Sequence, residues 1–316
     1  VATTITRVLS SITTQIAYAS ATQNGIMFIE LALGLHWLVL LHFVSNACLR
    51  TYQLLISPSI VSYLVHYQFY TAVPTVQKIE QNVIGRLRAT LFILGVKEWG
   101  MDSAMSHVIW QPLKQVGRWV RFLDSTWALV VSTVIILAGV SVPYSGALLH
   151  GVVWASGILS VLLFVRAYAS KGTALMCWTQ IFYGQLFASL LLGILSEADL
   201  YAITLYLAAI VVAYVVGLCC LALLMRSTGK YSLLEFHGYM YAHPVLGNVF
   251  FLACLAMMVF PITPSFVGEE LLLSTIHTDY LALLVVFALG YVVLGVSVMR
   301  LFAKVFFGPR QQTNDE

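Results

Sequence analysis

Long apolar runs, each about as long as one membrane crossing, constrain the fold of this chain more than any other feature. They lie at about 14–34, 36–62, 126–142, 147–166, 174–195, 200–225, 244–274 and 280–306. A helix of about 20 apolar residues covers the ~30 Å hydrocarbon core of a bilayer. Only 9% of the residues are charged, against about 25% in soluble domains. We therefore predict an all-α polytopic membrane protein with about eight transmembrane helices.

The basic residues sort to one side of the membrane when the chain alternates through these runs. All of the sixteen Lys and Arg residues except Arg50 fall on the side where the first run begins. The opposite side receives Glu197, Asp199 and Asp279, with Glu30 lying toward it. The positive-inside rule makes the basic side the cytoplasm, or the matrix in a mitochondrion. We predict a multi-pass protein of the cell inner membrane, or of the mitochondrial inner membrane if the source is eukaryotic.

The same pattern divides the chain into four parts. Residues 1–66 hold a helix pair, 67–125 form a polar segment on the basic side, 126–225 hold four helices, and 226–316 hold a broken helix and the last helix. Val1 leads directly into a threonine-rich stretch, and we expect the chain to be the C-terminal part of a longer protein.

The polar segment contains two stretches with helical character. Residues 83–97 are apolar with basic residues at both ends, and residues 107–123 alternate aromatic and basic positions. The second stretch predicts an amphipathic helix in the membrane interface. Such a helix is either a lateral strut that docks a partner or a segment resting on anionic headgroups, and we favour the second interpretation.

Two of the apolar runs are predicted to be broken helices. In 14–34, Gly25 follows several polar residues that include Gln23, and the overlong run 244–274 contains Pro261 and Pro264. Proline removes a helix hydrogen bond and kinks or ends a helix. Irregular backbone at membrane depth is tolerated only where it is buried in protein or lines a wet cavity. The alternative for 14–34 is a helix whose small residues pack closely against a neighbour.

Arg50 is the one basic residue inside an apolar run, and it belongs to a polar stripe. His42, Asn46 and Arg50 are spaced four residues apart and therefore share one helix face. A charge in the bilayer costs about 2.5–3.5 kcal/mol on insertion scales and marks a functional site by default. Histidine relays protons, whereas arginine keeps its charge and tunes its neighbours. The alternatives are a structural histidine and an arginine paired with a carboxylate to fix helix packing.

Glu269 and Glu270 follow the two prolines closely and lie toward the acidic side. Adjacent helical residues point about 100° apart, so we predict that one carboxyl group is exposed. The other is a candidate for reversible proton exchange inside the bilayer. Its alternative is a position at the wet exit of the helix.

We find no pattern for a cofactor or for catalysis by the chain itself. The five Cys residues lie in apolar runs without Cys-x-x-Cys spacing, and no zinc spacing, phosphate-binding Gly loop or recognisable haem site is present. We therefore predict no metal, no cofactor and no nucleic-acid partner.

Three segments carry a resemblance to a known family. IAYASATQNGIMF (Ile16–Phe28), HFVSNACLRTYQLLISPSIV (His42–Val61) and PITPSFVGEELLL (Pro261–Leu273) occur in the family's order. They resemble the signatures of the antiporter-like membrane subunits of NADH–quinone oxidoreductase and of Mrp-type cation/proton antiporters. The long interval between the second and third segments resembles the branch that forms the membrane subunit of DAB-type inorganic-carbon transporters.

The resemblance assigns positions to a chain of ionisable groups at mid-membrane. His42 takes the place of the family's first histidine, Asn46 replaces the second, and Arg50 takes that of a central lysine. Glu269 takes a distal Lys or Glu position, and Thr13 stands where the family has another lysine. These replacements argue against simple proton pumping by the full family mechanism.

The resemblance implies a proton- or cation-translocating subunit of an ion-coupled complex. On the DAB-type branch, it would energise uptake of carbon dioxide or bicarbonate with a large zinc-containing, carbonic-anhydrase-like partner on the cytoplasmic side. The alternatives are a respiratory or Mrp-type antiporter-like subunit, a non-conducting scaffold subunit and a stand-alone substrate transporter. The predicted pathway residues are His42, Asn46, Arg50, Glu269, Glu270, Gln23, Thr13 and Glu30.

Overall fold

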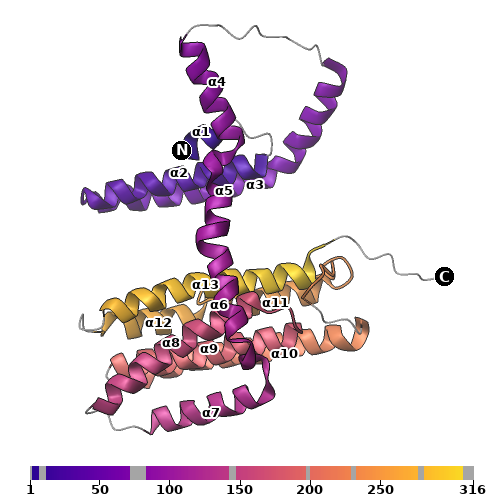
Figure 1. The fold of residues 1–316 in the computed structure, drawn as a ribbon. Coiled ribbons are helices and arrows are strands. Elements are labelled where there is room, and N and C mark those ends of the chain that lie inside the picture. The colour runs from indigo at the N-terminus through magenta and orange to yellow at the C-terminus, as the bar shows by residue number, and fades with distance from the viewer. Residues whose placement is uncertain are drawn as a thin grey trace, which may run out of the picture. The chain divides into compact units, whose positions relative to one another are not determined.

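The regular elements of the described chain are all helices (Figure 1). The computed structural model describes residues 2–6, 12–71, 83–141, 147–196, 200–228, 233–276 and 281–308. Its contacts form two compact units, Val1–Val108 and Ile109–Glu316. The boundary falls within the predicted segment 67–125, and the four-part division stays a prediction. Glu197, Asp199 and Asp279 lie outside the described residues.

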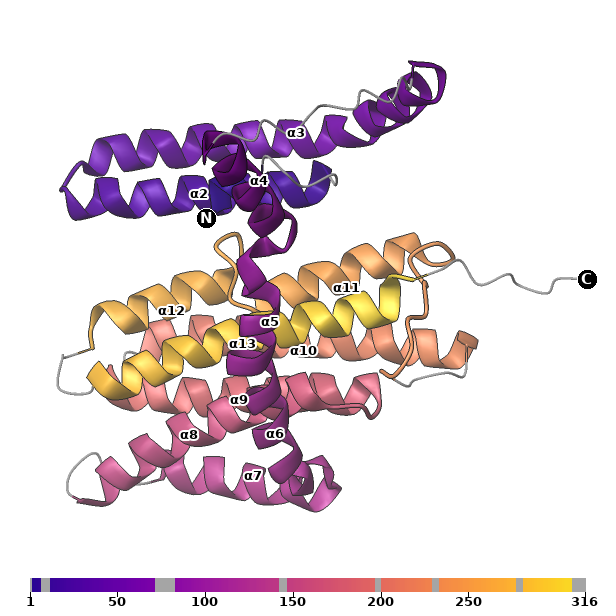
Figure 2. The same cartoon turned by 45° about the horizontal axis from the view of Figure 1, so that its top comes forward.

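The first unit is built around a helical hairpin. Its elements are α1 (Ala2–Thr6), α2 (Ile12–Ala32), α3 (His36–Thr71), α4 (Val83–Val96), η1 (Glu98–Gly100) and α5 (Met101–Met105). α2 and α3 lie side by side (Figure 2). Gly34, at φ +77°, makes the sharp turn between them, a conformation that glycine adopts without steric cost. Large apolar side chains such as Phe28 and Trp37 remain exposed on the hairpin.

Two expectations about this hairpin need correction. α2 continues without interruption through Gly25, so the predicted break in 14–34 is wrong. Glycine weakens a helix by only about 1 kcal/mol and keeps its backbone hydrogen bond, so it does not end a helix by itself. α3 continues to Thr71, beyond the predicted end at 62, because the backbone bonds of a helix extend past the end of its apolar run.

The second unit contains the remaining helices. They are α6 (Gln111–Trp119), η3 (Arg121–Asp124), α7 (Thr126–Val140), α8 (Ala147–Ala169), α9 (Ala174–Leu195), α10 (Leu200–Thr228), α11 (Pro244–Met257), α12 (Pro264–Ser274) and α13 (Leu281–Phe306), with the π-helical turn η2 (Ser106–Trp110) before them. The predicted runs from 126 onward match these helices closely. Local signals explain where three of these helices start. At the start of α9, the Thr173 hydroxyl accepts a hydrogen bond from the Met176 amide. A proline is the first residue of both α11 and α12.

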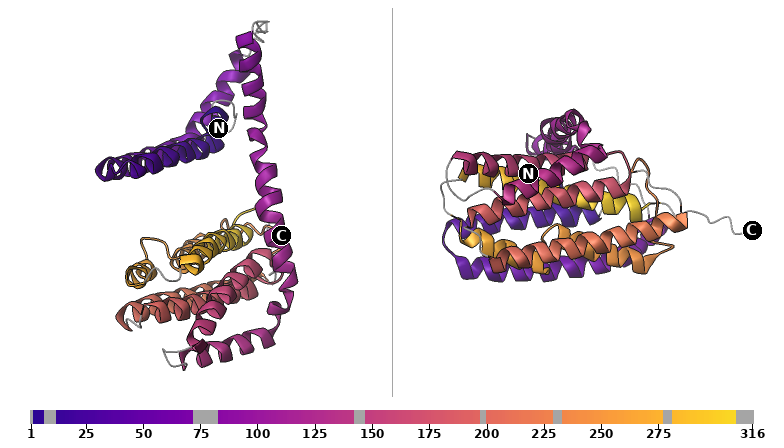
Figure 3. Two further views of the ribbon diagram at one scale, coloured as in Figure 1. Left: turned by 60° about the vertical axis from the view of Figure 1, so that its left-hand side comes forward. Right: turned by 90° about the horizontal axis from the view of Figure 1, so that it is seen from below.

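Helices α8, α9, α10 and α13 pack around an aromatic core in this unit. Figure 3 shows these helices running roughly along one another. Trp178, Tyr206 and Phe164 are fully buried between them. A Cβ atom at Gly217 would lie 2.4 Å from the Trp178 ring, so only glycine lets α10 accept this indole. The core therefore depends on contacts between helices that are distant in sequence.

Four helices are long and apolar enough to span a membrane among the residues described. They cover Leu149–Ala169, Ala174–Leu195, Leu200–Arg226 and Leu281–Phe306. Trp127–Val140 and Pro244–Met257 are shorter apolar helices. The chain is thus an all-helical membrane protein with four such helices in its described part, and the eight crossings stay a prediction.

The ends of several membrane-spanning helices meet at one basic end of this unit. Arg300 donates hydrogen bonds to the carbonyl groups of Tyr168, in the last turn of α8, and of Ser170, directly after it. The Leu233 amide bonds the Gly172 carbonyl at 3.1 Å, and the His237 amide bonds the Lys304 carbonyl at 3.0 Å. These contacts bring the C-terminal ends of α8 and α13 and the start of α9 to the same end, as the predicted sorting of basic residues requires.

Candidate functional site

The predicted break in 244–274 is present between α11 and α12. The helix ends at Met257 and resumes at Pro264, which confirms the prediction from the two prolines. Val259 has φ +57°, an uncommon conformation for a β-branched residue. Such strain persists only where the surroundings over-determine it, so the break is a fixed feature of the fold.

Side chains satisfy the carbonyl groups released at the end of α11. The Gln185 amide on α9 donates to the Met257 carbonyl oxygen at 2.6 Å. The Ser265 hydroxyl on α12 donates to the Ala256 carbonyl oxygen at 2.8 Å. The last carbonyls of a helix have no partner within the helix, and an unpaired one is costly in an apolar interior. Gln185 therefore links the break to the centre of the helical bundle.

A buried polar cluster surrounds Gln185. The Tyr206 hydroxyl on α10 donates to Gln185 Oε1 at 2.7 Å and lies 2.7 Å from the Tyr291 hydroxyl on α13. Tyr291 in turn interacts with the Glu269 carboxyl group on α12. We call Gln185, Tyr206, Glu269 and Tyr291 the core cluster. Its members come from four different helices: Gln185, Tyr206 and Tyr291 are joined by hydrogen bonds, and Glu269 lies beside Tyr291.

Gly268 explains how Glu269 reaches this cluster. A Cβ atom at Gly268 would lie 2.6 Å from the Tyr206 backbone nitrogen, so α12 touches α10 backbone to backbone. Glu269 is 9% exposed, whereas Glu270 is exposed. The prediction that one of the two glutamates is exposed is therefore confirmed.

The hairpin of the first unit holds five of the predicted site residues, namely Gln23, Glu30, His42, Asn46 and Arg50. His42 Nδ1 on α3 lies 2.9 Å from Glu30 Oε1 on α2, and His42 Nε2 lies 2.7 Å from Gln23 Oε1. Both ring nitrogens therefore lie at hydrogen-bond distance from side-chain oxygen atoms of α2. Arg50 occupies the same helix two turns further on. We call Gln23, Glu30, His42, Asn46, Arg50 and Gln53 the hairpin cluster.

Arg50 donates hydrogen bonds to two residues of its own helix. Its Nε donates to Asn46 Oδ1 at 3.2 Å and its Nη1 donates to Gln53 Oε1 at 2.6 Å. The ion pairs of the described residues are His42–Glu30 and Arg166–Asp124, so Arg50 has no carboxylate at ion-pair distance among them. Thr13 lies in α2, but its side chain is outside the described part of the structure.

Sequence reasoning missed two members of the core cluster. Tyr206 and Tyr291 are tyrosines in long apolar helices, and only the packing of α10 against α12 and α13 reveals their role. Gln185 is likewise absent from the predicted pathway residues. An amide in a run that is otherwise apolar, as at Gln185, is the signal that could have led to the cluster, because such a group needs a partner in the bilayer.

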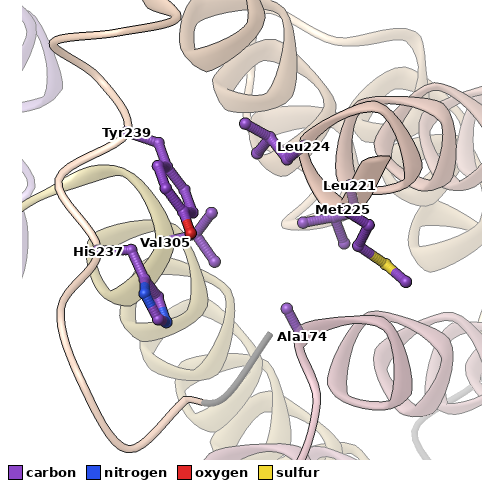
Figure 4. Close-up of a pocket in the computed structure, with 7 residues that line it drawn as sticks. All are labelled: Ala174, Leu221, Leu224, Met225, His237, Tyr239 and Val305. Carbon is purple, nitrogen blue, oxygen red and sulfur yellow. The ribbon is translucent and has the colours of Figure 1, made fainter. Parts of the chain in front are cut away.

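Two cavities lie elsewhere in the second unit. Figure 4 shows the first, at the basic end, where Tyr239 and His237 face apolar residues of α9, α10 and α13. The Tyr239 hydroxyl is buried without a hydrogen-bond partner, and a single ordered water fits such a site. The second is an apolar groove between α10 and α11, lined by residues such as Val212 and Leu252. No metal-binding group of side chains occurs among the described residues.

No protein-family model, curated protein or solved structure matches this chain. The resemblance to antiporter-like subunits therefore depends on the three quoted segments alone. The core and hairpin clusters do not depend on this resemblance, because they are defined by contacts between side chains in the structure.

Proposed function

We propose that this chain is a proton- or cation-translocating membrane subunit that crosses the bilayer about eight times. The observation that carries the proposal is Glu269: a carboxyl group buried in the second half of a broken helix and lying beside the Tyr291 hydroxyl group of a neighbouring helix. Broken helices that line polar sites at mid-membrane are characteristic of ion-translocating proteins. A carboxyl group in the membrane is expensive and commonly belongs to an ion or proton path.

The core cluster has the chemistry that proton transfer requires. The Glu269 carboxyl group is the member that binds and releases a proton. Tyr206 and Tyr291 have hydroxyl groups that donate and accept hydrogen bonds, and they lie 2.7 Å apart. Gln185 holds Tyr206 in place and satisfies the helix break. In this proposal Glu269 is the exchanging group and the two tyrosines connect it to the interior.

The hairpin cluster supplies the second set of groups. His42 contacts Glu30 directly, and imidazole and carboxyl groups are the side chains that most often transfer protons in proteins. Arg50 keeps its positive charge at any working pH. Its side chain donates hydrogen bonds to neutral amides, and no carboxylate of the described residues forms an ion pair with it. This supports a role for Arg50 in setting the local field, and it weighs against the scaffold hypothesis, which expects an arginine paired with a carboxylate.

The decisive experiment compares two adjacent glutamates. The intact protein with its natural partners is reconstituted in liposomes, and proton uptake is followed with a pH-sensitive dye. Glu269→Gln is expected to lower the rate by about 100-fold, since a positioned acid–base group contributes roughly that much or more. Glu270→Gln is the matched control and is expected to change the rate by less than about two-fold, because Glu270 faces outward.

The control for folding is Glu269→Asp, which keeps the carboxyl group. It should restore part of the transport lost in Glu269→Gln. Normal transport in an Arg50→Ala and Glu269→Gln double variant would overturn the proposal and favour a scaffold.

The resemblance adds a partner to the proposal. On the DAB-type branch, the chain energises uptake of inorganic carbon by a carbonic-anhydrase-like zinc protein bound at the basic face. Purification of the intact complex under mild conditions tests this directly. A large zinc-containing subunit supports the carbon-uptake assignment, whereas quinone-reductase or Mrp-type subunits replace it with the respiratory or antiporter assignment.

A further inference from the structure

The segment α6–η3 is held against α8 by a glycine contact. A Cβ atom at Gly117 would lie 2.3 Å from Ala169 Cβ and 3.1 Å from the Val165 carbonyl oxygen. About two turns before Gly117, at the end of η2, the centroid of the Trp110 ring lies 5.5 Å from that of the Tyr168 ring. The two elements are therefore in close contact, and Figure 2 shows α6 crossing α8 steeply.

An ion pair between the buried Arg166 and the partly exposed Asp124 fixes the rotation of this segment. Arg166 Nε on α8 donates to Asp124 Oδ1 at 2.6 Å, and Arg166 Nη1 donates to the Gly117 carbonyl oxygen at 2.8 Å. The Gln180 amide on α9 also donates to Asp124 Oδ1 at 2.7 Å. Asp124 thus binds side chains of both α8 and α9, and these contacts determine which faces of the segment stay exposed.

The contacts place α6 at the end of a membrane-spanning helix. Every α8 residue named above lies in the last turns of the Leu149–Ala169 span. The same end carries Arg300, which binds the Tyr168 and Ser170 carbonyl groups. The end of a span is the level of the lipid headgroups, so α6 crosses α8 at that level.

The free faces of the segment carry uncompensated positive charge and exposed aromatic rings. Lys114, Arg118 and Arg121 are exposed, and Trp119 and Phe122 are 73% and 68% exposed. Residues 107–123 contain no Asp or Glu, and Asp124 is already bound to Arg166. Basic side chains with interfacial aromatic rings are typical of helices that lie on an anionic membrane surface.

We infer that the α6–η3 segment binds anionic phospholipid headgroups through Lys114, Arg118 and Arg121, with Trp119 and Phe122 in the interface. This surface is independent of the ion path. Charge complementarity favours the lipid over other occupants, because the three basic side chains are exposed, have no ion-pair partner within the described residues, and lie where anionic headgroups are concentrated.

The test titrates the full chain in neutral detergent micelles with phosphatidylglycerol, and with phosphatidylcholine for comparison. Thermal unfolding at each lipid concentration gives an apparent Kd. The unsubstituted protein should bind phosphatidylglycerol more tightly than phosphatidylcholine, and added salt should weaken this preference. The double variant Lys114→Gln and Arg118→Gln should bind phosphatidylglycerol about 25-fold more weakly, since each basic residue contributes roughly five-fold at a membrane surface.

A double variant of exposed basic residues outside the segment, Lys171→Gln and Arg226→Gln, is the matched control. It should keep most of the affinity for phosphatidylglycerol. Equal loss in both double variants, or equal binding of the two lipids by the unsubstituted protein, overturns the inference. Loss of a co-purifying acidic protein from the Lys114 and Arg118 variant, with lipid binding unchanged, would assign the surface to a protein partner instead.

Discussion

The two polar clusters differ in how far apart their members lie in the sequence. The hairpin cluster joins two consecutive helices, and its longest recorded contact links His42 to Gln23. The core cluster joins four helices, and Tyr291 lies far along the chain from Gln185. Gln185 and Tyr206 are fully buried, whereas the His42 and Glu30 side chains are 22% and 15% exposed. The clusters should therefore respond differently to the same kinds of substitution.

The largest difference is expected between the two ion pairs. Arg166 is 5% exposed, and Arg166→Met leaves the partly exposed Asp124 and the Gly117 carbonyl group without their cation. Loss of hydrogen bonds to a charged group costs about 1.5–3 kcal/mol. His42→Phe removes a partly exposed pair and should cost about 1 kcal/mol or less. Thermal unfolding of the purified protein in detergent measures both changes. Equal losses of stability would show that the two units are equally dependent on their charges.

Two glycine substitutions should have opposite signs. Gly268→Ala forces α12 away from the Tyr206 backbone, and overpacking of this kind costs about 1–3 kcal/mol. Gly25→Ala in α2 meets nothing within 4 Å and should stabilise the helix by about 0.5–1 kcal/mol. The same unfolding measurement compares them. A stabilising Gly268→Ala would mean that α12 is free to move and that the placement of Glu269 is not fixed by this contact.

A pair of glutamine substitutions extends the comparison to hydrogen bonds. Gln185→Leu leaves the Met257 carbonyl group and the Tyr206 hydroxyl without this partner, at a cost of about 1–3 kcal/mol. Gln53→Leu removes one hydrogen bond from Arg50, which keeps Asn46, and should cost less than about 0.5 kcal/mol. Unfolding curves that shift equally for both variants would contradict the central structural role of Gln185.

The difference between local and long-range contacts explains which parts of the structure the sequence could predict. Apolar runs predicted α8, α9 and α10 with nearly correct ends, and Pro261 and Pro264 predicted the break, because these signals are local. The stripe of His42, Asn46 and Arg50 was likewise visible from helical spacing. The break predicted near Gly25 was wrong, since a glycine alone is not sufficient to end a helix.

The non-local contacts were not predictable from one sequence. Tyr206 and Tyr291 are ordinary apolar-helix residues until α10, α12 and α13 pack together. Asp124 is one acidic residue in a polar segment, and its pairing with Arg166 depends on how α6 crosses α8. Helical periodicity states which residues share a face, but it contains no information on which helix that face contacts.

The smallest effect on stability is expected from Glu30→Gln. Glutamine has the shape of glutamate and can still bond the His42 ring, so the change should cost about 1 kcal/mol or less. It replaces the carboxyl group beside His42, however, with an amide that cannot bind and release a proton. Transport in liposomes should therefore fall clearly while the melting temperature stays nearly constant. Transport that remains at the level of the unsubstituted protein would remove Glu30 from the path and leave the hairpin cluster as a structural contact between α2 and α3.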